Sequence, residues 1–205
     1  GELKTPDTWE VALSGGADKK ETFTRLLEEE KLGYFALLRN LRNMEQAGVD
    51  DGLVREAILA RRNGAEHILP FRYIAAARAA PTFERELDKA MLKSVDYGER
   101  WEGKTLVLVD VSGSMNDKLS AKSDLRRVDA AAGLAAIVPS EKVAIVVFSN
   151  GVRQVPPRRG MAAVDAITAQ VGGGTYLGEA LKSIAHNDMD RLIVITDEQS
   201  HDSVG

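Results

Sequence analysis

The chain has 205 residues, with 27 lysine and arginine residues against 31 aspartate and glutamate residues, and 44% of its residues are hydrophobic. This balance is typical of a globular protein and excludes a strongly basic nucleic-acid-binding protein, so any RNA binding must use a local patch. The absence of cysteine and of any apolar run near the roughly 18 residues of a membrane span predicts a cytoplasmic protein without disulfides, thiolate metal sites or a membrane segment.

The first half of the chain has the apolar spacing of helices. Residues 34–47 place Leu37, Leu41 and Met44 on one helical face, and Gly48 is a typical C-terminal stop. Pro70 is suited to open a helix, and Thr82 is predicted to cap one. Further helices are predicted over residues 7–13, 18–30, 51–63, 71–80 and 83–95. Short helices joined by short turns predict a HEAT-like helical-repeat array over residues 1–100, with an irregular helical bundle as the alternative.

In residues 101–205, apolar strands alternate with helices. Strands are predicted over residues 105–109, 142–148, 152–155 and 191–196. Helices are predicted over residues 128–138, 161–171 and 177–185. This alternation predicts an open, mostly parallel sheet covered on both faces, so the fold class is α followed by α/β. We also expect the chain to stop short of a further strand, which would leave residues 191–196 as an apolar edge open to pairing.

Hydroxyl and carboxylate groups follow two of the predicted strands and fill a glycine-rich loop. The carboxyl ends of parallel strands meet at one edge of a sheet, where ligands usually bind. The loop Gly172–Gly174 can approach this edge closely because glycine tolerates tight backbone conformations. Oxygen donors of this kind suit Mg²⁺ or another divalent cation. The predicted ligands are Asp110, Ser112, Ser114, Thr175 and Asp197.

These residues are also compatible with a structural turn or a catalytic role. The Asp110 segment alone is also compatible with a solvated turn whose aspartate caps the next helix. An aspartate-nucleophile phosphotransferase would need a second carboxylate where Ser112 stands, and no histidine pairs with an acid to make a catalytic base. His201 follows Asp197 closely enough to approach the metal loop, although an exposed loop histidine is the simpler interpretation. We therefore predict a binding protein rather than an enzyme.

Several arginines of the helical half could contact RNA phosphates. In the alternative interpretation, each arginine belongs to a solvated surface and pairs with a nearby glutamate. The candidate residues are Arg39, Arg42, Arg61, Arg62, Arg72 and Arg78.

The strand-end residues resemble the metal-ion-dependent adhesion site of von Willebrand A domains. That resemblance implies direct contacts to Mg²⁺ from Ser112, Ser114 and Thr175, with Asp110 and Asp197 acting mainly through water. It also implies that an acidic residue of a protein partner completes the coordination of the ion.

Three segments of the chain are similar to the Ro autoantigen family and its bacterial relatives, in which a TROVE module of helical repeats precedes a von Willebrand A domain. These segments are FALLRNLRNM at residues 35–44, ILPFR at 68–72 and LSAKSDLRRVDAA at 119–131. The resemblance implies binding of small noncoding RNAs, including Y RNAs, and of misfolded RNAs in quality control with exoribonuclease partners.

The helical half departs from this family, because about 90 residues are too few to close a ring built from repeats of roughly 40–47 residues. The competing hypothesis is therefore a metal-dependent protein-interaction module that has lost RNA binding.

Overall fold

A computed structural model of the chain describes residues 18–96, 99–121, 125–156, 158–199 and 201–202. The chain divides into two compact units, Gly1–Ala90 and Met91–Gly205, with the division inside the last helix of the helical half. The helix expected over residues 7–13 lies outside the described residues. In the described part of the chain, no helix is both long and apolar enough to cross a membrane.

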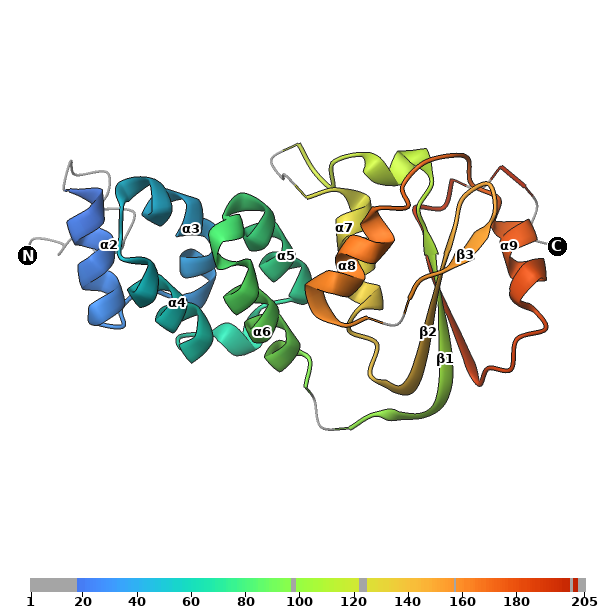
Figure 1. Cartoon of the computed structure of the whole chain (residues 1–205), viewed down its shortest axis with the longest axis horizontal. Coiled ribbons are helices and arrows are strands. Elements are labelled where there is room, and N and C mark those ends of the chain that lie inside the picture. Colours follow the sequence, from blue (N-terminus) through green and yellow to red (C-terminus); the bar gives the residue numbers. More distant parts are fainter. Residues whose placement is uncertain (1–17, 97–98, 122–124, 157, 200, 203–205) are drawn as a thin grey trace, which may run out of the picture. The chain divides into compact units, whose positions relative to one another are not determined.

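The first unit is helical (Figure 1). Two short 3-10 turns, Ala65–His67 and Pro81–Phe83, join some of its helices. Helices α2, α3 and α4 pack on one another, and α3 also packs on α5. A stack of helical hairpins produces this neighbour pattern. The helices are α2 (Lys19–Glu28), α3 (Tyr34–Ala47), α4 (Asp51–Ala60), α5 (Pro70–Ala79) and α6 (Glu84–Ser94).

The ends of these helices follow from local chemistry. Asp50 accepts a hydrogen bond from the Leu53 backbone at the start of α4, and Gly48 ends α3 with a φ of +72°. Helix α4 ends three residues earlier than predicted, because Arg61 adopts the left-handed conformation that terminates it. The predicted cap at Thr82 is wrong: this residue lies inside a 3-10 turn, and its hydroxyl donates to the Glu45 carboxylate.

The second unit contains a four-stranded sheet in the order β3-β2-β1-β4. Strand β1 pairs in parallel with β2 and β4, whereas β3 pairs antiparallel with β2 across the Asn150-Gly151 turn. The sequence therefore predicted the mostly parallel sheet correctly. The strands are β1 (Trp101–Asp110), β2 (Ser140–Phe148), β3 (Val152–Gln154) and β4 (Arg191–Ile195).

Helices cover both faces of this sheet, with α7 (Arg127–Ala135) and α8 (Gly160–Thr168) on one side and α9 (Leu177–Ile184) on the other (Figure 1). On the α9 side, Leu106, Leu108 and Phe148 form an apolar core with the helix. Burial on both faces explains why β1 is a continuous apolar run in the sequence. Strand β4 is an edge of the sheet that the described residues form, and its Leu192 and Val194 side chains are exposed.

Candidate functional site

The carboxyl ends of β1 and β4 carry two of the predicted metal ligands. These strands are parallel neighbours, with Val109 opposite Ile195, so Asp110 and Asp197 follow at the same edge of the sheet. The Thr196 hydroxyl donates to Asp110 Oδ2 at 2.7 Å, which ties the two strand ends together. The sheet itself thus brings together groups that are more than 80 residues apart in the chain.

The loop after β1 holds its side chains in a fixed arrangement. Asp110 is fully buried, and its Oδ1 accepts a hydrogen bond of 2.8 Å from the backbone nitrogen of Ser112. The hydroxyl oxygens of Ser112 and Ser114 lie 3.2 Å apart. The 3-10 turn Gly113–Asn116 begins between these serines and turns the chain back. The spacing of two residues therefore gathers two hydroxyls beside one buried carboxylate.

The glycine-rich loop docks directly on this segment through backbone hydrogen bonds. Gly113 donates to the Gly173 carbonyl at 2.9 Å, and Gly172 donates to the Val111 carbonyl at 2.8 Å. Gly173 has a φ of +87°, and a Cβ there would lie 2.9 Å from Asn150 Nδ2. Glycine is therefore favoured at position 173, because the positive φ strains other residues and a side chain there would displace Asn150.

Thr175 follows that loop and is buried. Its backbone nitrogen donates to His201 Nδ1 at 3.1 Å, while the His201 backbone nitrogen donates to the Thr175 carbonyl at 2.8 Å. The His201 ring also lies 5.9 Å from the Tyr176 ring, between centroids. His201 is an exposed residue, as the simpler interpretation expected, yet it fastens the Thr175 segment at this edge of the sheet.

Asp197 has one satisfied and one unsatisfied carboxylate oxygen. Arg127 Nη1 donates to Asp197 Oδ2 at 2.9 Å and lies 3.4 Å from the Ser114 carbonyl. Asp197 Oδ1 is buried and has no hydrogen-bond partner among the residues that the structure describes. Buried polar atoms are nearly always satisfied by a protein group, water or an ion. The chemistry of these residues therefore fits a small hard cation, because two carboxylates and three hydroxyls are oxygen ligands of the kind that such a cation prefers.

Sequence reasoning missed the groups that support these ligands. Arg127, which pairs with Asp197, and Thr196, which donates to Asp110, are not among the predicted site residues. Neither is Asn150, whose Oδ1 accepts from the Gly174 backbone at 2.6 Å. Asp202 accepts hydrogen bonds from the Gly178 and Glu179 backbone at the start of α9. No local pattern predicts these contacts, because each joins segments that are distant in the chain.

Four of the six predicted RNA contacts lie on α3 and α5. These two helices together carry four arginines and one glutamate, Glu45. Arg42 Nε donates to the Ala79 carbonyl at 3.1 Å, so the ends of the two helices lie side by side. We call Arg39, Arg42, Arg72 and Arg78, all of them exposed, the arginine cluster.

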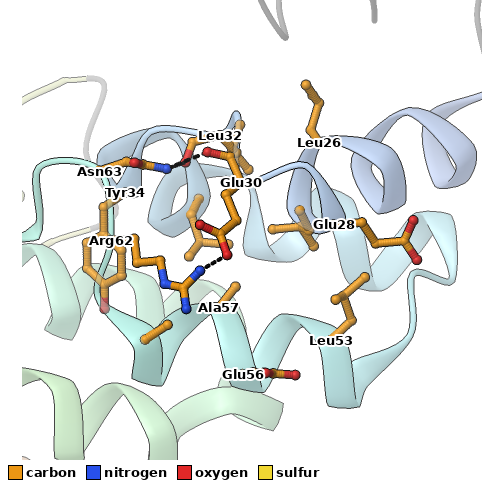
Figure 2. Close-up of a pocket in the computed structure, with 13 residues that line it drawn as sticks. Leu26, Glu28, Glu30, Leu32, Tyr34, Leu53, Glu56, Ala57, Arg62 and Asn63 are labelled. Atoms are coloured by element: carbon orange, nitrogen blue, oxygen red, sulfur yellow. Dashed lines mark hydrogen bonds and ion pairs between the residues drawn. The ribbon is translucent and has the colours of Figure 1, made fainter.

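The other two candidates have a different environment. Arg61 ends α4 and its Nη2 donates to the Ala65 carbonyl at 3.4 Å, while its buried Nε has no hydrogen-bond partner in the described part of the chain. Arg62 forms an ion pair with Glu30 in a pocket between α2 and α4 (Figure 2). Glu28 and Glu56 also line this pocket, and neither has an ion-pair partner among the described residues. Three carboxylates against one guanidinium make the pocket unfavourable for phosphate.

Two family models match the chain. Residues 2–142 match the TROVE domain, which is more than half of the sequence, and residues 105–199 match the von Willebrand factor type A domain. The second match runs from within β1 to beyond the end of β4 and therefore includes all five predicted metal ligands.

Individual relatives were also found. The chain is 30% identical to telomerase protein component 1 of Mus musculus over 90 residues, which are 42% of this chain and 3% of that protein. It is similar to the crystal structure of the Deinococcus radiodurans RO (RSR) protein, with a TM-score of 0.58 and 21% identity. That similarity covers 99% of this chain and 53% of the other, so the present sequence spans about half of the RO protein. The two proteins therefore share a fold that joins a helical unit to an α/β unit.

Proposed function

The chain belongs to the TROVE domain family and carries a von Willebrand factor type A domain, and from that premise we propose that it binds noncoding RNA through its arginine cluster. The observation that carries this proposal is the charge of α3 and α5, which hold four exposed arginines against one glutamate in a chain of net charge −4. Arginine donates to phosphate through a planar fork of N–H groups, and an exposed cluster of them binds the RNA backbone electrostatically.

The finer part of this proposal follows from the family resemblance. The RNA is a small noncoding RNA of the Y RNA type or a misfolded RNA, and the role is RNA quality control with an exoribonuclease as partner. The protein acts in the cytoplasm by binding and catalyses no reaction. The acidic pocket of Figure 2 takes no part, because its carboxylates repel the RNA backbone.

The α/β unit adds a Mg²⁺ site to this function. Ser112, Ser114 and Thr175 would hold the ion directly, and Asp110 and Asp197 would hold it through water. When bound, the ion would offer a coordination position to an acidic side chain of a protein partner. The unsatisfied Oδ1 atom of Asp197 supports this assignment, because a hydrated cation would supply the donor that this buried oxygen lacks.

A salt titration of RNA binding tests the central proposal. Filter binding of a Y RNA fragment is expected to weaken steeply as salt rises, because each phosphate contact releases counterions. The variant Arg39→Ala/Arg42→Ala should make the fall of log affinity with log salt less steep, reducing the magnitude of the slope by about two, since each phosphate contact contributes about one. The matched variant Lys19→Ala/Lys20→Ala removes the same charge from α2 and should change the slope little. Equal slopes in the two variants would contradict the assignment to the arginine cluster.

The second candidate function is a metal-dependent protein-interaction module without RNA binding. The strand-end site (Asp110, Ser112, Ser114, Thr175 and Asp197) favours it, because Asp110 and Thr175 are buried there and none of these five residues belongs to the arginine cluster. Absence of RNA binding at low salt, combined with a rise in melting temperature on addition of Mg²⁺, would support this function in place of the first.

A further inference from the structure

An exposed phenylalanine lies within the arginine cluster. Phe35 is 40% exposed, so part of its ring surface is accessible to a ligand beside these cations. The guanidinium carbon of Arg39 lies 5.6 Å from the centre of the Phe35 ring, and that of Arg72 lies 5.1 Å from it. Phe35, Arg39 and Arg42 follow one another at i, i+4 and i+7, the spacing of one face of α3.

A second aromatic ring orients one of these arginines. The guanidinium of Arg72 lies 5.0 Å from the centre of the Phe71 ring, so it contacts two aromatic rings at once. Among the described residues, neither Arg39 nor Arg72 forms an ion pair with an acidic side chain. A guanidinium held beside an aromatic ring by a cation–π interaction can still donate its N–H groups to an anion. These donors are therefore available to an anion that the helical unit itself does not supply.

This combination has the properties of a site for an unpaired nucleotide. Proteins bind unpaired bases by stacking them on aromatic rings or on arginine planes, while nearby cations contact the phosphates. An exposed ring covers its apolar surface when a base stacks on it, and the cations remain beside the backbone. A duplex hides the faces of its bases, so it could use the arginines but not the ring.

We propose that Phe35, together with Arg39 and Arg72, forms a stacking site for one unpaired nucleobase, with Phe71 orienting Arg72. The site rests on the proposed RNA binding and deepens it, because it assigns a base contact where the arginine cluster alone accounts only for phosphate contacts. The Phe35 ring and the two guanidinium groups contact the base, and the guanidinium N–H groups donate to the adjoining phosphates.

The experiment uses the full chain and a single-stranded oligoadenylate carrying one 2-aminopurine, whose fluorescence falls when the base stacks. An abasic oligonucleotide of the same length and a duplex serve as ligands without an accessible base. Phe35→Leu keeps an apolar side chain but removes the ring, and Phe35→Trp restores a ring. Leu59→Ala, at a side chain on α4 that is 39% exposed, is the matched control for loss of exposed apolar surface. Circular dichroism establishes that each variant is folded.

Phe35→Leu is expected to weaken binding of the single strand by roughly 5- to 30-fold and to abolish the fluorescence quenching, because one stacked base contributes this much. Phe35→Trp should restore both signals, and abasic and duplex binding should change little in any variant. Equal binding of oligoadenylate by the wild type and Phe35→Leu, with equal quenching, would overturn the stacking site while leaving RNA binding intact. Failure of the wild type to bind any of the ligands at low salt would overturn the proposed function itself, and the stacking site with it.

Discussion

The arginine cluster and the strand-end site use charge in opposite ways. The arginines are long, exposed side chains on the surfaces of two helices, and they can move to meet a ligand. Asp110 and Asp197 are short side chains held by hydrogen bonds at the edge of a sheet. An exposed cluster adds its contributions one charge at a time and tolerates loss of a member. A buried site depends on every partner, because an unpaired buried group costs far more than an exposed one.

The largest effect is expected from Asp110→Ala. This change leaves the Ser112 backbone nitrogen and the Thr196 hydroxyl without their acceptor, and it should lower the free energy of unfolding by about 3 kcal/mol. It should also abolish the rise in melting temperature that we expect Mg²⁺ to produce in the wild type. Urea denaturation and thermal melts with and without Mg²⁺ measure both quantities.

Asp117→Ala is the control for Asp110→Ala, since it removes an exposed carboxylate from the same loop that lies 3.9 Å from Arg127 Nη1, whereas Asp197 Oδ2 lies 2.9 Å from that atom. It should preserve most of the stability and the whole Mg²⁺ response. An Asp110→Ala protein that still responds to Mg²⁺ as the wild type does would contradict the metal assignment.

A smaller effect is expected from Arg39→Ala/Arg72→Ala. Both side chains are exposed, so stability should change little, while affinity for single-stranded RNA at low salt should fall roughly 10- to 30-fold through lost phosphate and stacking contacts. The matched variant Arg39→Lys/Arg72→Lys retains the charge but not the guanidinium plane, and it should recover only part of the loss. Full recovery with lysine would show that charge alone acts here, which would sharpen the contrast with the strand-end site.

Arg127→Ala tests whether the guanidinium of Arg127 competes with a metal ion for Asp197. Arg127 occupies Asp197 Oδ2, so its removal should lower stability without metal by about 1 kcal/mol, and Mg²⁺ should then raise the melting temperature more than in the wild type. Arg126→Ala is the control, because Arg126 binds Asp129 and Asn116 instead. A Mg²⁺ response no larger than that of the control would refute the competition.

The smallest effect is expected from Arg62→Ala. Arg62 and Glu30 form an ion pair between side chains that are 57% and 56% exposed, and such pairs contribute at most about 0.5–1 kcal/mol. Arg62 lies among carboxylates that repel phosphate. Its loss should therefore change RNA affinity by less than about twofold. A tenfold loss of RNA affinity in the same filter-binding assay would show that the RNA-binding surface includes the acidic pocket as well as the arginine cluster.

Much of this molecule could be predicted from local patterns alone. The apolar period of residues 34–47 predicted the bounds of α3, because a helix repeats its buried face every three to four residues. The continuous apolar runs predicted the central strands. Strand β1 nevertheless begins at Trp101 rather than Thr105, with a shift in its pairing with β2 between Trp101 and Lys104. The two-residue spacing of Asp110, Ser112 and Ser114 was also visible, since one short loop carries all three.

By itself, then, the sequence determined the order of helices and strands and the chemical character of each loop, because these depend on neighbours a few residues apart. Only the tertiary structure decided which of these segments meet. Arg127 pairs with Asp197 across 70 residues, and Phe35 contacts Arg72 on a different helix. Such contacts depend on how sheets and helices pack, and packing depends on the summed burial of the whole chain rather than on any short pattern.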